Sequence, residues 1–231
     1  MKRKFPWRAL CTALAVVLIF AGVALALFPK FSDMQYQHRV QAAQKAFTAQ
    51  AAETDYDRLY RELQRRNEAL YATGQSALKD PFSYSVADID LAKYGIKDNT
   101  IGYLSVPRLG VTLPILLGAN SENLLHGAVH LTQTSYPIGG TNTNSVIAAH
   151  RGWNRAQMFR HIEKLQVGDP VYVQNFRETL TYTVSEIEII YPNEVDKLHI
   201  RPGQDMLTLI TCHPYRVNDR RYVVYCTRSE N

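Results

Sequence analysis

A cysteine and a histidine each stand where an apolar run of the sequence gives way to a turn. Cys212 ends the run 207–212 and is followed by a turn containing Pro214, and His150 directly follows the run 145–149. A strand fixes the direction of the side chain at its end, while the turn beyond it leaves space for a substrate. We therefore expect a thiol and an imidazole that are both presented at strand ends.

A cysteine and a histidine together can carry out nucleophilic catalysis on a carbonyl carbon. The thiolate is the attacking form, and a neighbouring imidazolium favours that ion and supplies the proton that a leaving amine needs. A single histidine at a strand end is more often structural, but its combination with Cys212 indicates that His150 belongs to a catalytic pair.

Arg221 lies nine residues after Cys212 and begins the run 221–227. A hairpin between the two runs would bring its guanidinium back to the cysteine, where a fixed fork of donors can hold the oxyanion of a tetrahedral intermediate. The neighbouring Arg220 should point to the opposite face of the strand. The spacing alone fits an ordinary surface arginine equally well.

The remaining cysteines leave a structural alternative open. Cys11 lies in an N-terminal apolar run, so an exported protein could pair Cys212 with Cys226 in a disulfide. Cys226 also fits a half-buried position in an alternating strand, which would leave Cys212 reactive. A metal site built from Cys212, His213 and His150 is not expected, because adjacent side chains on a strand diverge.

From residue 101 onward the sequence has an all-β pattern. Short runs bounded by glycine- and proline-containing turns are typical of strands, and one of them alternates strictly between apolar and polar residues. The runs are 101–106, 111–117, 145–149, 170–175, 180–190, 206–212 and 221–227. We expect a mostly β fold over residues 100–231, a closed or nearly closed β-barrel with short helices in its loops.

Residues 9–28 form an apolar run of 20 residues without a charge, about the length needed to cross ~30 Å of hydrocarbon as a helix. A basic tail at residues 1–8 precedes the run and is expected to stay in the cytoplasm. Residues 24–26, Ala-Leu-Ala, also fit a signal-peptide cleavage site, but the apolar run exceeds the usual ~7–15 residues. We therefore favour a retained transmembrane signal-anchor in the lipid bilayer, with the rest of the chain outside the cell.

The charge of the chain gives no support to a nucleic-acid partner. The net charge is +5, but four positive charges lie in the tail at residues 1–8, which leaves only +1 for the rest. A leading group of cations before an apolar run is a topology signal rather than a phosphate-binding patch. We exclude nucleic acid as a partner.

Residues 29–99 are expected to form an extracellular helical region and a long loop. One long or two shorter amphipathic helices should cover about residues 33–72, with start and stop signals at Ser32, Asp33, Thr54, Asp57 and Gly74. Their apolar stripe should pack on the main domain, because such a stripe rarely stays exposed. The strand-free segment that follows is long enough to be a lid or binding loop, and a plain linker is the alternative.

The motifs around these residues resemble the sortase family. Thr-Leu-Ile-Thr-Cys at 208–212, Pro-Tyr at 214–215 and Arg221 resemble the sortase signature, and Ala-His-Arg-Gly at 149–152 resembles its histidine motif. Residues 101–107 and the following strand are similar to the opening strands of the family. The resemblance covers about residues 80–228 and implies a sortase-like closed β-barrel, preceded by an N-terminal helical segment, a lid and a transmembrane helix.

Within the family, the segment ahead of the barrel resembles the class C, or pilus-building, sortases. Asp80, Pro81 and Phe82 look like the lid motif of that class, whose acidic and aromatic residues lie over the catalytic cleft. The residues after the histidine also follow the class, at Trp153, Phe159, Leu165, Gly168 and Asp169. His213 departs from the threonine that is more usual there, and Arg216 departs from a frequent glycine.

The resemblance implies a cysteine transpeptidase without a metal or organic cofactor. Cys212 would attack the Thr–Gly bond of an LPxTG-like sorting signal to give a thioester, His150 would protonate the departing amine, and Arg221 would hold the oxyanion. The expected partners are pilin or surface proteins that carry such a signal. The acceptor would be a pilin lysine amine or a peptidoglycan amine.

Three other functions remain as alternatives. An exported cysteine hydrolase would use the same pair with water as acceptor, and a membrane-tethered pilus or wall scaffold would not react at all. A peptidoglycan L,D-transpeptidase is disfavoured, since its Ser-His-Gly-Cys cluster is missing from the sequence. Amine-dependent joining of peptides distinguishes a transpeptidase from the first two.

Overall fold

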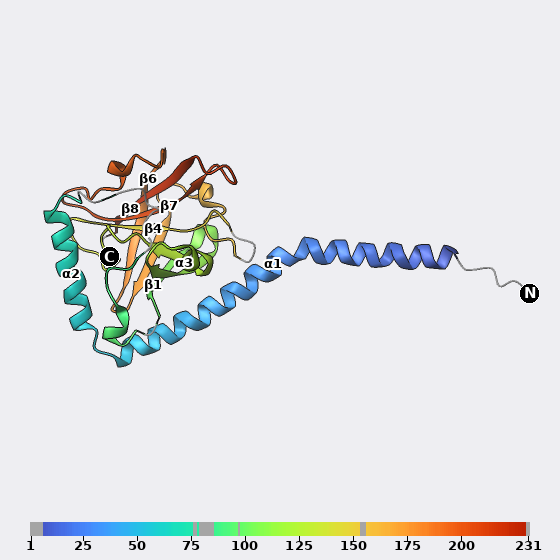
Figure 1. Cartoon of the computed structure of the whole chain (residues 1–231), viewed down its shortest axis with the longest axis horizontal. Coiled ribbons are helices and arrows are strands. Elements are labelled where there is room, and N and C mark those ends of the chain that lie inside the picture. The colour runs from blue at the N-terminus through green and yellow to red at the C-terminus, as the bar shows by residue number, and fades with distance from the viewer. Residues whose placement is uncertain (1–6, 76–77, 79–85, 97, 153–155, 230–231) are drawn as a thin grey trace, which may run out of the picture.

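The computed structural model describes residues 7–75, 78, 86–96, 98–152 and 156–229. Within these residues, eight strands close into a barrel in the order β1-β2-β3-β4-β7-β8-β6-β5 (Figure 1). The strands are β1 Thr100–Val106, β2 Val111–Leu117, β3 Ala128–His130, β4 Thr143–Ala148, β5 Pro170–Asn175, β6 Thr179–Ile190, β7 Asp205–His213 and β8 Arg220–Arg228. The predicted mostly β closed barrel is confirmed.

The strand β3 is the element that the sequence pattern does not predict. It has only three residues, all of them buried, so it has no alternation of apolar and polar side chains. It pairs in parallel with β2 and antiparallel with β4. This short strand therefore joins the two halves of the barrel, and without it the barrel would be open between β2 and β4.

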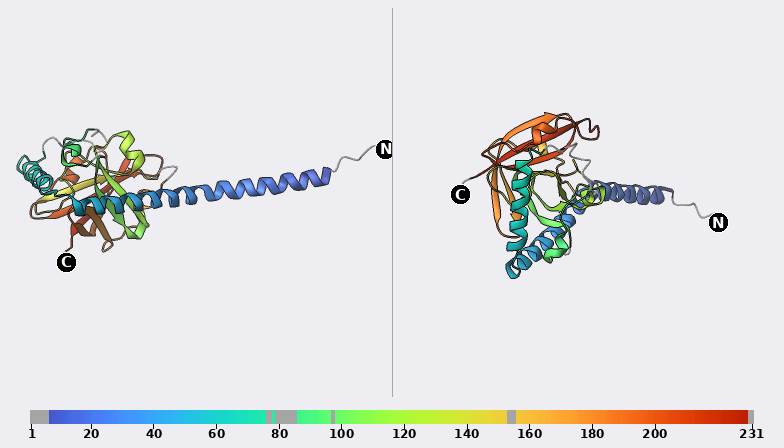
Figure 2. Two further views of the ribbon diagram at one scale, coloured as in Figure 1. Left: turned by 90° about the horizontal axis from the view of Figure 1, so that it is seen from below. Right: turned by 60° about the vertical axis from the view of Figure 1, so that its left-hand side comes forward.

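The helix α1 is longer than expected and spans Trp7–Glu53 as one element. The predicted helix start at Ser32 and Asp33 is wrong, because the helix continues through Pro29 and the carboxylate of Asp33 instead accepts hydrogen bonds from the backbone N–H and side-chain amide of Gln157, at 2.9 and 3.0 Å. A proline inside a helix removes one backbone hydrogen bond and commonly bends it. Figures 1 and 2 show α1 changing direction along its length.

The N-terminal part of α1 is apolar and exposed, whereas its C-terminal part lies against the barrel (Figure 2). The helix is long and apolar enough to cross a membrane, with a mean hydropathy of 2.7 in its most apolar window. In the docked part, Tyr36 and Val40 are buried, and the Tyr36 hydroxyl donates to the carbonyl of His126 at 2.7 Å. Phe47 packs edge-on against Tyr103, so the predicted packing of the apolar stripe is confirmed.

The second helix, α2, spans Asp57–Ala72 and buries Leu59 and Leu63. It ends as expected at Gly74, which has φ +62° and donates to Tyr71, while the next N–H donates to Leu70. This double hydrogen bond satisfies carbonyls that a helix end leaves open, and glycine is favoured at the left-handed position. The expected cap at Thr54 is wrong, because the cap residue is Tyr56, without a side-chain bond.

The remaining helices are short and lie in the connections, as predicted. Among the described residues they are α3 Ser121–His126 and the 3-10 turns Leu91–Tyr94, Pro107–Leu109, Ile162–Lys164 and Val195–Leu198.

Candidate active site

The parallel pairing of β4 and β7 brings His150 and Cys212 to the same end of the barrel. Ala148 lies opposite Ile210, so the histidine and the cysteine each follow this pair by two residues. The pairing continues beyond the strand, because the N–H of Ala149 donates to the carbonyl of Ile210 at 3.3 Å and Thr211 Oγ1 donates to the carbonyl of Ala149 at 2.7 Å. Parallel strands in register thus present both side chains at one edge.

The antiparallel hairpin of β7 and β8 places Arg221 directly opposite Cys212. Directly paired residues have Cβ atoms about 4.5–5.5 Å apart, so the guanidinium and the thiol belong to one site. Arg221 is 8% exposed, and its guanidinium donates to the carbonyls of Asn218 and Arg220, each at 3.0 Å. The adjacent Arg220 instead lies over the ring of Tyr191, at 3.6 Å, as the alternation of side chains predicts.

The environment of His150 favours the neutral imidazole. Burial lowers the pKa of His150 below its usual value. A lowered pKa makes the protonated ring a stronger acid, which suits a group that must give a proton to a leaving amine. The backbone at this position is held by a hydrogen bond from the N–H of Phe159 to the carbonyl of His150, at 3.1 Å.

The register of β7 and β8 excludes the disulfide alternative. Cys226 faces Leu207, five residues before Cys212 on β7, which corresponds to about 16 Å along a strand. Disulfide bonding requires Cα atoms within about 7 Å. Neither cysteine is in a disulfide, and burial raises the pKa of the Cys226 thiol, which keeps it protonated and unreactive.

A family model for the sortase domain matches residues 104–229, more than half of the chain. The chain belongs to the sortase family. Members of this family are cysteine transpeptidases. Among curated relatives, sortase A of Bacillus anthracis is 30% identical over 128 residues, which cover 55% of this chain and 59% of that protein. The chain spans about half the length of the curated sortases that it matches.

Solved structures of class C sortases are similar over more of the chain. Sortase C1 of GBS pilus island 1 has a TM-score of 0.75 and 31% identity, covering 83% of this chain and 98% of that one. A lid mutant of Streptococcus agalactiae sortase C1 has a TM-score of 0.73 and 29% identity, covering 81% and 97%. The likeness therefore includes helical parts ahead of the barrel.

In this sortase barrel, Arg151 connects the strand end that carries the histidine to the one that carries the cysteine. Its guanidinium contacts His213 Nδ1 and lies 3.5 Å from the carbonyl of Cys212, and its other nitrogen pairs with Glu163 at 2.9 Å. It also lies over the ring of Tyr222, at 5.6 Å. Arg151 directly follows His150 in the sequence, but its contacts with His213 and Glu163 span 62 and 12 residues and could not be predicted from spacing.

His213 points away from the thiol and serves as the acceptor for Arg151. Burial, followed by the nearby charge of Arg151, lowers the pKa of His213. A neutral Nδ1 can accept the guanidinium N–H, whereas a protonated ring would repel it. His213 therefore supports the cysteine strand rather than sharing a set of metal ligands with Cys212, and no group of three or more metal-binding side chains occurs in the described part of the chain.

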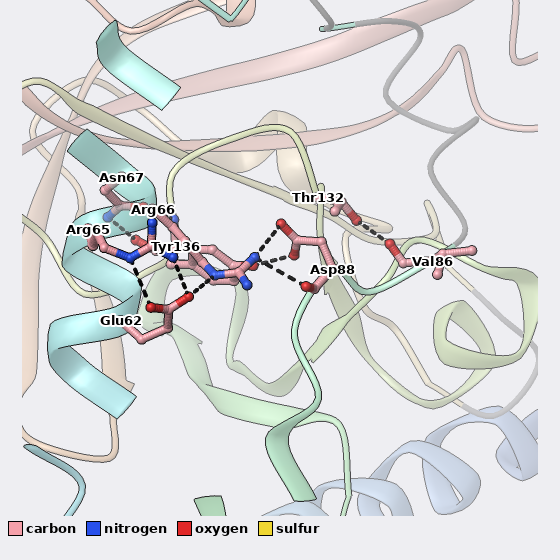
Figure 3. A network of polar contacts seen from close by, with 8 residues as sticks. All are labelled: Glu62, Arg65, Arg66, Asn67, Val86, Asp88, Thr132 and Tyr136. Carbon is pink, nitrogen blue, oxygen red and sulfur yellow. Dashed lines mark hydrogen bonds and ion pairs between the residues drawn. The ribbon is translucent and has the colours of Figure 1, made fainter. Parts of the chain in front are cut away.

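The predicted lid residues Asp80, Pro81 and Phe82, and also Trp153, lie outside the described residues. The segments on either side of residues 79–85 are held to the barrel. Before it, Leu78 is buried, 7% exposed. After it, the carbonyl of Val86 accepts from Thr132 Oγ1 at 2.9 Å (Figure 3).

A polar network fixes the chain just after this segment (Figure 3). Asp88 contacts the hydroxyl of Tyr136 and pairs with Arg66 of α2 at 3.1 Å. Arg66 also pairs with Glu62 at 2.7 Å, and the hydrogen bonds from Arg65 and Arg66 lower the pKa of Glu62 to about 2. The network thus connects α2, the segment ahead of β1 and the loop before β4.

Proposed function

We propose that this sortase is a cysteine transpeptidase in which Cys212 is the nucleophile, His150 the general acid and base, and Arg221 the oxyanion donor. The observation that carries the proposal is the pairing of Cys212 with Arg221 across β7 and β8, at the barrel end to which β4 leads His150. A nucleophile, a proton carrier and a fixed cation at one edge are the groups that acyl transfer through a thioester requires.

The reaction proceeds in two acyl transfers. The thiolate of Cys212 attacks the threonine carbonyl carbon of an LPxTG-like signal, the Thr–Gly bond breaks, and His150 gives its proton to the departing glycine amine. The incoming primary amine then attacks the thioester carbon, returns a proton to His150 and releases the thiolate. Arg221 binds the carbonyl oxygen while it carries negative charge in both steps, and no cofactor takes part.

The acceptor amine is a pilin lysine, with a peptidoglycan amine as the alternative. The likeness to sortases C over more than four-fifths of the chain supports the pilus-building subclass. Residues 9–28 anchor the enzyme in the membrane, residues 1–8 remain in the cytoplasm, and the region 29–99 and the barrel at 100–231 lie outside the cell. The apolar N-terminal part of α1 supports this arrangement.

The residues Asp80, Pro81 and Phe82 form a lid over the active site. Two observations support this hypothesis: a lid is present in the similar Streptococcus agalactiae sortase C1, and the residues on both sides of 79–85 are held to the barrel. In the closed state the carboxylate of Asp80 would pair with Arg221 and the ring of Phe82 would cover Cys212.

The proposed function is tested with the full chain in detergent, carrying Cys11→Ser. Incubation with a sorting peptide should give a thioester on Cys212 that mass spectrometry detects, and an added amine should convert it to a joined product. Cys212→Ala should abolish joining, whereas Cys226→Ala should remain active. Cleavage without joining would indicate a hydrolase, and an adduct on Cys226 would refute the site.

A further inference from the structure

An exposed tyrosine in the turn after Cys212 contacts two arginines. The guanidinium carbons of Arg160 and Arg216 each lie 5.3 Å from the ring centre of Tyr215, which is 40% exposed. We call these three residues the arginine rim. Stacking on a ring uses the flat face of a guanidinium and leaves its N–H groups, which lie in the plane, open to a carboxylate.

The arginine rim joins the two turns that follow the proposed catalytic residues. Tyr215 comes three residues after Cys212, and Arg160 packs against Gly152, which comes two residues after His150. A Cβ atom at Gly152 would lie only 3.1–3.2 Å from the side-chain carbons of Arg160. The two guanidinium groups therefore lie on the turns that follow both proposed catalytic residues.

The charges of the arginine rim are not neutralised within the described part of the chain. No ion pair there involves Arg160 or Arg216, and the nearby Glu163 is paired with Arg151. Glu194 accepts a hydrogen bond from the backbone N–H of Tyr191 at 2.6 Å. Asp219 lies in the same turn as Arg216, and its charge raises the pKa of His213, against the larger lowering by burial and Arg151. The rim thus presents two positive charges with open donors.

Arg216 is held at a position that suits glycine better. Its φ is +71°, in the left-handed region that non-glycine residues adopt only at an energetic cost. A side chain that is present despite this cost and that stacks on Tyr215 is better explained by a contact with a ligand than by the stability of the turn.

We propose that the arginine rim binds an acidic side chain of the polypeptide substrate, close in sequence to the segment that reacts at Cys212. This inference rests on the proposed function. An extended peptide advances about 3.3 Å per residue, so a carboxylate only a few residues from the cleaved bond can reach the turns that bear Arg160 and Arg216. The rim would then select substrates by the charge that flanks their sorting signal.

The test compares sorting peptides that share the reacting segment and differ only by Asp and Glu against Asn and Gln in the flanks. For the full chain in detergent at low salt, the acidic peptides should have a KM about threefold to tenfold lower, with kcat unchanged, and the difference should shrink as salt screens the charges. Arg160→Gln with Arg216→Gln should remove the difference in KM between the acidic and the amide peptides.

Two further variants separate binding from folding. Arg58→Gln is the matched control, because Arg58 also stacks on a tyrosine, Tyr94 at 5.1 Å, but lies on α2. It should retain the preference. Arg216→Gly should weaken the preference while raising the melting temperature, since it relieves the left-handed backbone.

Fluorescence anisotropy measures binding of the same peptides to Cys212→Ala. It separates the proposed function from the proposal that the arginine rim binds acidic side chains. Preferential binding of acidic peptides without turnover in the parent would contradict the proposed function and support the rim. Equal affinity for acidic and amide peptides, or a preference that survives in the double variant, would overturn the inference. Inhibition by a polyphosphate wall polymer that depends on Arg160 and Arg216, together with no effect of peptide charge, would also overturn the inference.

Discussion

Arg221 and Arg220 are neighbours on β8 that differ in their surroundings, and so they should differ in their effect on catalysis. Arg221 faces Cys212 and is held by two carbonyls, whereas Arg220 stacks on Tyr191. Loss of one oxyanion donor typically costs ~10²–10³ in rate. We expect Arg221→Ala to lower kcat by at least this factor. Arg221→Lys should also have a low kcat, because an ammonium lacks the planar fork of a guanidinium.

The matched control is Arg220→Ala, whose kcat should stay within a few-fold of the parent. The measurement is the steady-state rate of joining of a sorting peptide to an amine. A severe loss in Arg220→Ala together with a mild loss in Arg221→Ala would mean that the oxyanion donor is the other arginine.

At the level of single residues, strand ends could be predicted from the sequence because apolar runs stop abruptly there. This pattern predicted that Cys212 and His150 stand at strand ends, and the pairing of β4, β7 and β8 brings those ends together with Arg221, for which the spacing alone fitted a surface arginine equally well. Arg151 was missed because its role depends on two distant partners, Glu163 and His213, and spacing along the chain carries no information on such contacts.

Among the elements, the turn after β4 contacts the end of β7 through Arg151. We expect Arg151→Ala to lower kcat about 10-fold to 100-fold with little change in KM, because a small displacement of reacting groups is costly. Arg151→Lys should also be impaired, since one ammonium cannot contact both His213 and Glu163 in the geometry of a guanidinium.

Glu163→Gln is the control for this element contact and should stay within about threefold, because the carboxylate is 46% exposed and such ion pairs contribute little. Melting curves followed by circular dichroism separate positioning from stability. An unchanged kcat in Arg151→Ala would show that β4 and β7 keep their relative position without it.

The lid hypothesis predicts how substitutions at Asp80 and Phe82 change access to Cys212. A lid that competes with substrate lowers activity by the fraction of molecules in which it is closed. Asp80→Ala and Phe82→Ala should therefore each speed alkylation of Cys212 by a small thiol reagent and raise turnover of a sorting peptide. The effects of the two substitutions should not add fully in the double variant, since both residues act through one closed state. Equal alkylation rates in all four proteins would identify the segment as a linker.

The elements that the sequence could not predict are those that tertiary contacts determine. The three-residue β3 is too short to show a period, and it exists because β2 and β4 provide partners on both sides. The helix start expected at Asp33 did not occur, because the side chain found partners on Gln157 of the barrel instead of capping its own backbone. Long periodic segments such as α2 were predictable.

For the whole molecule, the buried His130 should make stability depend on pH. Burial lowers its pKa from 6.5 to about 4, while its ring nitrogen bonds with the carbonyl of Ser135 at 3.0 Å. Between these two pH values the unfolded chain binds more protons than the folded one, so stability falls as the pH is lowered through this window. The loss should approach about 3 kcal/mol, at about 1.4 kcal/mol per unit of pKa.

Urea unfolding of the full chain in detergent, followed by circular dichroism from pH 7 to pH 4, measures this effect. His130→Gln is the comparison, because an amide can still donate to the carbonyl but does not titrate in this range. Contributions from His150 and His213 are common to both proteins and cancel in the difference. Parallel curves for the two proteins would assign the acid sensitivity to other groups.

The docking of α1 fixes where the enzyme can work. Asp33 contacts the barrel only five residues after the apolar run ends at residue 28, about 7 Å along a helix. If that run spans a bilayer, we expect the docked part of α1 to hold the barrel close to the lipid headgroups. A substrate that is itself held in the membrane would then meet the enzyme by lateral diffusion in two dimensions.

The rate of the chemical steps and the rate at which enzyme and substrate meet can be measured separately. A flexible insertion of Gly and Ser between residues 30 and 32 should leave turnover of a free peptide in detergent within about twofold, since the active site is untouched. In lipid vesicles the same insertion should slow joining of membrane-held substrates, because the active site then samples many heights and orientations. Equal rates in vesicles would mean that the height of the barrel above the bilayer does not matter.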